Sequence, residues 1–145
     1  MSTYADTSFL ISLYTPDANS AEAVTFFANA SVPVLLTPFG EVEFANAIEL
    51  RVFRREIDAA QATASLRAYH DDVNRGLFIR QPVPTMSYER AISLSRRHTR
   101  RLGTRGMDVL HVAIAAELDV DAFVTFDDRQ RRLARAAGLS VRPRN

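Results

Sequence analysis

The chain has 145 residues and a net charge of +1, and 47% of its residues are hydrophobic and 24% charged, as is typical of a soluble globular protein. This length predicts one domain over residues 1–145. No apolar run approaches the ~20 residues that span a bilayer, and no basic segment precedes a short hydrophobic stretch, so we expect neither a membrane span nor a secretory signal. Cysteine is absent, which excludes disulfides and thiolate metal ligands and fits a cytoplasmic protein.

The first half of the chain predicts two units in which a short strand is followed by helices. Residues suited to capping precede each helix: Thr7 or Ser8, then Asn19 or Ser20, then Thr37 before a proline. The expected elements are a strand over 3–6, helices over 7–14 and 21–30, a strand over 32–36 and a helix over 40–55.

The second half continues the alternation of helices and strands. Asp58 and Ser87 are expected to cap two helices, and Gly76 to close the first of them. The expected elements are helices over 59–74 and 88–102, a weak strand over 77–80 between them, a helix from Asp108, a buried strand over 120–126, a helix over 129–137 and a strand over 139–142. This order predicts a three-layer α/β/α domain in which helices flank a short central parallel sheet.

Acidic residues fall where two of these strands end. Asp6 follows the first strand, Asp127 follows the strand over 120–126, and Asp108 opens the helix before it. Ligands of parallel sheets gather at the carboxyl ends of the strands, so these carboxylates are candidates for a shared site. Each also has a purely structural interpretation, because acids are favoured at helix starts and in turns.

Glu43 is the fourth candidate. Helical spacing puts it on one face with Phe39, Asn46, Ala47 and Leu50, where a carboxylate should be partly buried and therefore paired or bound to a metal. Glu41 points elsewhere and is the competing candidate, but we favour Glu43.

Carboxylates that converge repel one another, and at neutral pH they need protons or a cation. Mg²⁺ or Mn²⁺ prefers such oxygen ligands and completes its shell with water and substrate phosphate. Such an ion activates water and neutralises phosphoryl oxygens, so the chemistry that fits is phosphodiester hydrolysis.

Three stretches of the chain match the motifs of a known family in the family's order. They are YADTSFLISLY, TPFGEVEFANAIELRVFR and GTRGMDVLHVAIAAELDVDAFVTFDDRQRRLARAAGLSV, which together make up about half of the chain. On these residues the chain resembles PIN-domain proteins of the VapC type, the ribonuclease toxins of toxin–antitoxin pairs. The resemblance implies a PIN-like fold, a Mg²⁺- or Mn²⁺-dependent endoribonuclease, an RNA substrate, a cognate VapB-type antitoxin and a homodimer.

The resemblance also assigns roles to individual residues. The family's metal-binding acids fall on Asp6, Glu43, Asp108 and Asp127. In the family these acids hold the ion whose bound water attacks the phosphodiester. The family's E-x-x-N-A motif adds Asn46 to these candidate site residues, and its T-x-D motif adds Thr125. Asp128, next to Asp127, is a further candidate. The hydroxyls expected to support the ligands by hydrogen bonds are those of Thr7, Ser8 and Thr125.

Basic residues and one histidine are further candidates. All 18 basic residues are Arg and none precedes Arg51, so residues 1–50, with six acids, carry −6 and the remainder, with 11 acids, carries +7. Arg97, Arg101 and Arg105 belong to a row that is interpreted either as an RNA-backbone clamp or as a solvated helix face. His111 lies three residues after Asp108; a partly buried structural role is favoured over contact with phosphate or metal.

Three functions are compared. The leading hypothesis is a VapC-type toxin that hydrolyses RNA, and the alternative is a PIN nuclease of RNA maturation or decay without a toxin role. A phospho-acceptor receiver domain also collects acids at strand ends, but it needs a lysine on a late strand and this chain contains none.

Overall fold

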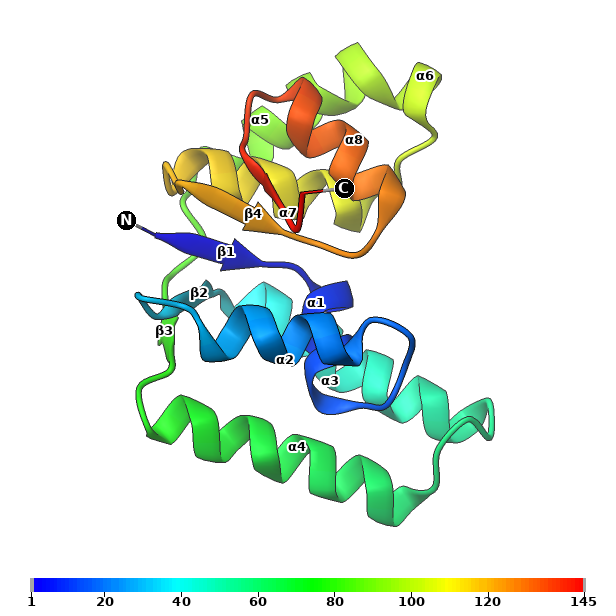
Figure 1. Ribbon diagram of the computed structural model, residues 1–145. Helices are drawn as coiled ribbons and strands as arrows, with labels where there is room; N and C mark the ends of the chain where they lie inside the picture. Colours follow the sequence, from blue (N-terminus) through cyan, green and yellow to red (C-terminus); the bar gives the residue numbers. More distant parts are fainter. Residues whose placement is uncertain (1, 145) are drawn as a thin grey trace.

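The structure is a computed structural model that describes residues 2–144. Short strands alternate with helices along the chain (Figure 1). The elements are β1 (Thr3–Ala5), α1 (Thr7–Tyr14), α2 (Ser20–Ala28), β2 (Val34–Leu36), α3 (Pro38–Phe53), α4 (Ala59–Asn74), β3 (Phe78–Arg80), α5 (Ser87–Leu94), the π-helical segment η1 (Ser95–Thr99), α6 (Arg100–Leu102), α7 (Gly106–Glu117), β4 (Ala122–Val124), α8 (Asp128–Ala136) and β5 (Val141–Arg142).

The five strands form one parallel sheet in the order β3-β2-β1-β4-β5. Strand β1 is central: Ala5 aligns with Val124 of β4, and Tyr4 aligns with Leu35 of β2. The chain leaves β1 for β2 on one side and later returns to β4 on the other. The carboxyl ends of β1 and β4 therefore border the switch point where open α/β sheets bind ligands.

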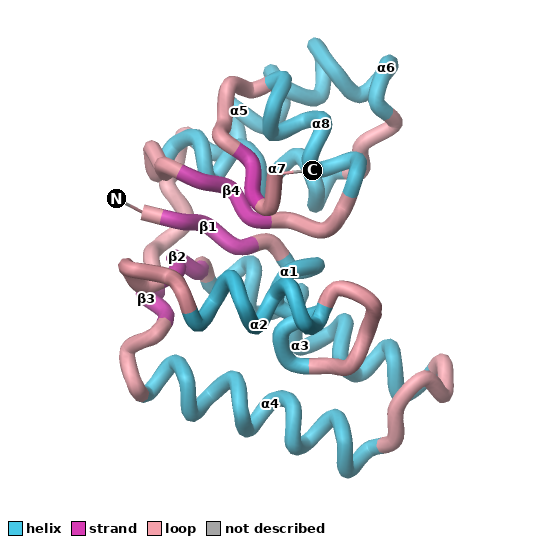
Figure 2. The backbone as a smooth tube through the Cα atoms, viewed as in Figure 1, coloured by secondary structure: helices cyan, strands magenta, loops and turns pink. Residues whose placement is uncertain are grey.

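Helices cover both faces of the sheet, so the predicted three-layer α/β/α fold with its parallel central sheet is confirmed. Helices α1 to α4 lie below the sheet in the view of Figure 1, and α5 to α8 lie above it; Figure 2 shows the short strands between these layers. Side chains alternate along β1, since Tyr4 packs in the hydrophobic core with α7 and α8 and Ala5 packs in the core with α1 and α3. On the side of the sheet that faces α7 and α8, Tyr4 stacks on Phe123 of β4.

Most predicted helices are present with small shifts in their ends. Thr37 caps α3 with Pro38 at its first position, and Asp58 caps α4 through a capping box with Gln61. The cap of α1 is Asp6 rather than Thr7 or Ser8, because the Asp6 carboxylate accepts the N–H of Phe9. The strand expected over 120–126 is limited to Ala122–Val124, and Asp127 caps α8 instead of ending that strand.

The predicted helix over 88–102 is wrong in two respects. Ser87 does not cap it: a turn that begins at Pro84 leads into α5, Ser87 is already helical, and no capping bond forms from its side chain. The helix is also interrupted by the π segment Ser95–Thr99 before α6 ends at Gly103. Similarly, α7 begins at Gly106, which makes Asp108 its third residue rather than its first. Over residues 2–144, none of the helices combines the length and apolarity that crossing a bilayer requires.

Candidate functional site

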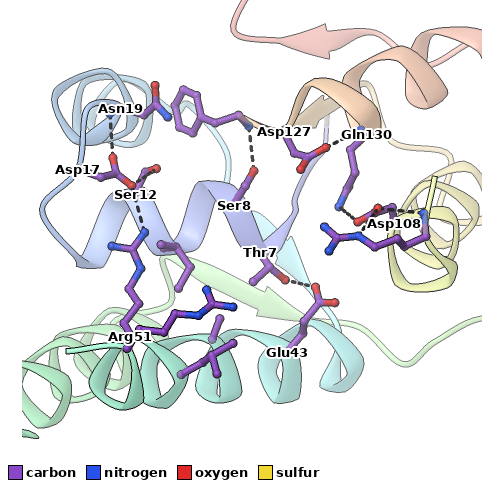
Figure 3. A pocket seen from close by; sticks show the side chains of 16 residues that line it. Thr7, Ser8, Ser12, Asp17, Asn19, Glu43, Arg51, Asp108, Asp127 and Gln130 are labelled. Carbon is purple, nitrogen blue, oxygen red and sulfur yellow. Dashed lines mark hydrogen bonds and ion pairs between the residues drawn. The ribbon is translucent and has the colours of Figure 1, made fainter. Parts of the chain in front are cut away.

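A cavity of about 460 Å³ opens beyond the carboxyl ends of β1 and β4. Its wall includes Glu43 from α3, Asp108 from α7 and Asp127 from the β4–α8 turn, together with Asp17 before α2, so four carboxylates that are far apart in the sequence line one space (Figure 3). The sheet order is what brings them together, because α1, α7 and α8 present their N-terminal parts at this edge and α3 lines it from Glu43 to its C-terminal end.

Asp6 lies behind this wall and is completely buried. Its Oδ1 accepts hydrogen bonds from Ser8 Oγ (2.7 Å) and the N–H of Phe9 (3.0 Å), and its Oδ2 accepts one from Thr125 Oγ1 (2.5 Å). Loss of hydration raises the pKa of Asp6, although these bonds and nearby His111 oppose the change. Ser8 and Thr125 therefore hold the Asp6 carboxylate by hydrogen bonds, and the support of a metal ligand by these hydroxyls stays a prediction.

Asp108 and Asp127 are joined through Gln130 of α8. Gln130 donates from Nε2 to Asp108 Oδ1 (3.3 Å) and from its backbone N–H to Asp127 Oδ1 (2.9 Å). The other oxygen of Asp108 accepts the backbone N–H of Arg105 at 3.2 Å and faces the Arg105 guanidinium at 3.5 Å. Gln130 was not a predicted site residue. Its place three positions after Asp127, at the start of a helix, is the signal from which it could have been identified.

Glu43 is held by hydrogen bonds that converge on one oxygen. Its Oε1 accepts the Thr7 hydroxyl and lies 2.6 Å from His111 Nε2. Burial alone would raise the pKa of Glu43, but the hydrogen bonds from His111 and Thr7 outweigh that effect and lower it. His111 is buried completely rather than partly, and its Nδ1 lies 2.7 Å from the hydroxyl of Tyr4.

Glu41 lies on a different side of α3 from Glu43. It accepts hydrogen bonds from Tyr69 of α4 and from the Arg80 guanidinium, which ties α3 to α4 and β3. Asn46 is exposed and is absent from the cavity wall, and Asp128 is largely exposed at the start of α8. The structure therefore does not bring Asn46 or Asp128 together with the cavity carboxylates.

The arginines near the cavity differ from those expected. Arg105 lines it, as predicted, but Arg97 and Arg101 lie in η1 and α6 and do not. Arg51, from the last turn of α3, and Arg54, the residue that follows this helix, line it instead. Nothing in the sequence singled these two out, because only the packing of α3 against α1 brings the end of that helix to the cavity.

The oxygen atoms that line the cavity suit a divalent ion that takes only some of its ligands from the protein. Carboxylate oxygens are the ligands that Mg²⁺ and Mn²⁺ prefer. Among residues 2–144, no three Asp, Glu, His or Cys side chains lie close enough to form a complete cage. Mg²⁺ is commonly bound by one or two carboxylates with water and substrate phosphate, so the absence of a cage is compatible with this ion. Among residues 2–144, Gln130 Oε1 has no hydrogen-bond partner although it is buried beside Asp108, so one oxygen acceptor at the cavity is open to a ligand or water.

The fold and cavity define an α/β domain with a carboxylate-lined site at the carboxyl edge of its parallel sheet. The family model of the PIN domain matches residues 3–136, and the chain belongs to the PIN-domain family. The resemblance stated from the sequence motifs is thus confirmed. No curated protein sequence gives a significant match.

Solved structures with the same fold support this assignment. VapC20 of Mycobacterium tuberculosis, a sarcin–ricin loop cleaving toxin, superposes with a TM-score of 0.71 at 22% identity over 98% of this chain and 100% of that one. FitAcB of Neisseria gonorrhoeae gives 0.66 at 16% identity over 96% and 95%. VapBC2 of Rickettsia felis, bound to a promoter DNA fragment, gives 0.66 at 13% identity over 100% of both.

Proposed function

We propose that this chain is a Mg²⁺- or Mn²⁺-dependent endoribonuclease that acts as the toxin of a VapBC-type toxin–antitoxin pair. The observation that carries the proposal is that Glu43, Asp108 and Asp127 face one cavity at the switch point of the sheet, with arginines on the same wall. Acids collect an ion there, and guanidinium groups bind the phosphates of the RNA backbone.

Each residue then has a defined task. Glu43, Asp108 and Asp127 would hold the ion, together with Asp6 at the rear of the site. The bound ion would supply a more acidic water and neutralise charge on the phosphoryl oxygens. Thr7, Ser8 and Thr125 orient the Glu43 and Asp6 carboxylates by hydrogen bonds. Arg105 keeps Asp108 in place and presents its guanidinium to the cavity, where it would contact the substrate phosphate.

The similar structures support the toxin role and its partners. One of them is VapC20, a sarcin–ricin loop cleaving toxin, and another is VapBC2, which is bound to a DNA fragment from its own promoter. For this chain we therefore propose RNA as the substrate, a VapB-type antitoxin as the inhibitor and a homodimer as the assembly.

Cleavage of RNA by the purified chain tests the enzymatic part. We expect cleavage with Mg²⁺ or Mn²⁺, its loss in chelator, and a fall of about 100-fold or more in Asp108→Asn and Asp127→Asn, because each removes a ligand charge. Asparagine is as good an N-cap as aspartate, so Asp127→Asn should keep helix α8. Asp128→Asn, the exposed neighbour, is the matched control and should cleave normally. Metal-independent cleavage, or full activity of both variants, would contradict the proposal.

Expression in a bacterial host separates the toxin from a nuclease of RNA maturation or decay. A toxin should arrest growth on induction, the Asp108→Asn variant should not, and co-expression of the product of an adjacent short gene should relieve the arrest. Continued growth with an active nuclease would favour the maturation enzyme.

A further inference from the structure

A buried chain of hydrogen bonds runs from the central strand to Glu43. The Tyr4 hydroxyl of β1 lies 2.7 Å from His111 Nδ1, and His111 Nε2 lies 2.6 Å from Glu43 Oε1. Tyr4 and His111 are each 1% exposed. Neither belongs to the cavity wall, whereas Glu43 does. The imidazole therefore stands directly behind a cavity carboxylate, out of reach of substrate.

The partners of the imidazole decide which of its nitrogens carries the proton. A carboxylate only accepts hydrogen bonds, so Nε2 must bear the hydrogen that points at Glu43. In the neutral ring Nδ1 is then an acceptor, and it is filled by the Tyr4 hydroxyl, which donates to it. Thr37 can in turn donate to the Tyr4 oxygen, since its side chain contacts that hydroxyl, and so every polar group of the chain is satisfied.

The rings of Tyr4 and His111 are fixed by packing as well as by hydrogen bonds. Tyr4 stacks on Phe123 with ring centroids 5.8 Å apart, and Phe39 of α3 packs on His111 with centroids 4.8 Å apart. The imidazole is thus clamped between the sheet, α3 and α7. Because the His111 ring cannot turn, its Nε2–H fixes the orientation of the Glu43 carboxylate that accepts from it.

The two oxygens of Glu43 are consequently unequal. Oε1 takes both the Thr7 hydroxyl and His111 Nε2, while Oε2 has no hydrogen bond or ion pair in the part of the chain that the structure describes. In Figure 3 Glu43 projects from α3 towards Thr7 at the mouth of the cavity. One oxygen is anchored and the other is left for a ligand.

We propose that His111, whose Nε2–H points at Glu43 and whose ring Tyr4 holds in place, is a positioning residue that fixes the Glu43 carboxylate so that one oxygen is presented to the ion in the cavity. The inference rests on the proposed function. Outer residues that orient ligands in this way typically affect metal affinity or activity by about 10- to 100-fold.

Binding of Mn²⁺ to the purified full chain, measured by calorimetry and by electron paramagnetic resonance, tests the role without relying on catalysis. His111→Leu removes the donor and should weaken Mn²⁺ binding by about 10-fold or more. His111→Gln keeps an N–H donor for Glu43 and a carbonyl acceptor for Tyr4 in a side chain of similar size, so it should restore most of the affinity. His70→Leu, at an exposed histidine of α4, is the matched control and should bind normally.

Nitrogen NMR of the histidine rings tests the geometry directly. The chain has only three histidines, so the His70 and His98 signals can be assigned by substitution. The His111 ring should show the Nε2–H form in the wild-type chain. Tyr4→Phe, which removes one oxygen and retains the stacked ring, takes the partner from Nδ1, so it should loosen the imidazole and weaken Mn²⁺ binding by several-fold.

The outcomes separate the two proposals. Wild-type affinity for Mn²⁺ in a folded His111→Leu chain, or an Nδ1–H ring in the wild type, overturns the positioning role and leaves the nuclease intact. If His111→Leu does not fold, wild-type affinity in Tyr4→Phe overturns it instead. A wild-type chain that binds no Mn²⁺ and cuts no RNA removes the proposed function itself.

Discussion

At the scale of single residues, structural and functional roles coincide on the same carboxylates. Asp6 caps α1, Asp127 caps α8, and Asp108 accepts the N–H that precedes α7. The two interpretations that the sequence left open, cap or ligand, are therefore compatible: capping fixes each acid where a strand ends or a helix starts, which is also where the cavity lies. The capping roles are observed, and the ligand roles stay predictions.

Asp6→Asn should stabilise the protein in the absence of metal. The buried charge is lost, yet the hydrogen bonds can be kept: an amide nitrogen at position 6 donates to Thr125 Oγ1, whose own hydrogen turns to Ser8 Oγ at 3.2 Å. We expect the free energy of unfolding, measured by urea titration in chelator at neutral pH, to rise by about 0.5 to 2 kcal/mol, the usual range of a stabilising substitution. Cleavage of RNA should be lost in the same variant.

The gain in the free energy of unfolding from Asp6→Asn should depend on pH in a defined direction. Burial raises the pKa of Asp6 in the folded chain, so the wild type loses stability as pH rises through that pKa and the carboxylate ionises. The difference between Asp6→Asn and the wild type should accordingly be largest near neutral pH and shrink as pH falls towards the ordinary pKa of aspartate. A difference that grows on acidification would show that Asp6 is not destabilised by its charge.

At the scale of elements, the sequence predicted correctly those helix starts that depend only on neighbouring residues. The Thr37-Pro38 start of α3 and the Asp58 cap of α4 were predicted correctly because each depends on residues within one turn. The π segment Ser95–Thr99 was missed, since no glycine or proline marks it. The strands were predicted too long, because apolar runs such as 120–126 continue past the few residues that pair with a neighbour.

The capping box of α4 offers a test of stability that leaves the cavity untouched. Asp58 Oδ1 accepts the N–H of Gln61 at 2.7 Å, and Gln61 Oε1 accepts the N–H of Asp58 at 2.8 Å. Asp58→Ala should lower the free energy of unfolding by about 1 kcal/mol. Asp71→Ala, near the end of the same helix, is the matched control and should be neutral or slightly stabilising, because an acid there opposes the helix dipole. Nuclease activity per folded molecule should be equal in both variants.

At the scale of the whole molecule, the sheet order determines which distant residues meet. The parallel sheet was predicted, and the pairing of β1 with β4 brings Thr125 within hydrogen-bond distance of Asp6. The strand-end argument had expected Asp6 and Asp127 to share this edge, and a site that both residues form stays a prediction. The partnership of His111 with Tyr4 and Glu43 joins three elements and has no local signature. The same holds for Arg51 and Arg54, which reach the cavity only because α3 packs along α1.

Substitution of two pairs of arginines can show where RNA crosses the molecule. Arg51 and Arg54 line the cavity from α3, whereas Arg97 and Arg101 are exposed on η1 and α6, away from the cavity wall. If the backbone runs over the cavity, Arg51→Ala with Arg54→Ala should raise KM for RNA several-fold and leave kcat nearly unchanged, because these groups bind phosphate without contacting the reacting atoms.

Each phosphate contact that is lost should also reduce the slope of log affinity against log salt concentration by about 0.7 for a single strand. The Arg97→Ala, Arg101→Ala chain carries the same change of charge and serves as the control. Its KM and salt slope should stay close to those of the wild type. The reverse result, with the second pair more sensitive than the first, would move the RNA path to the helix row that the sequence had suggested.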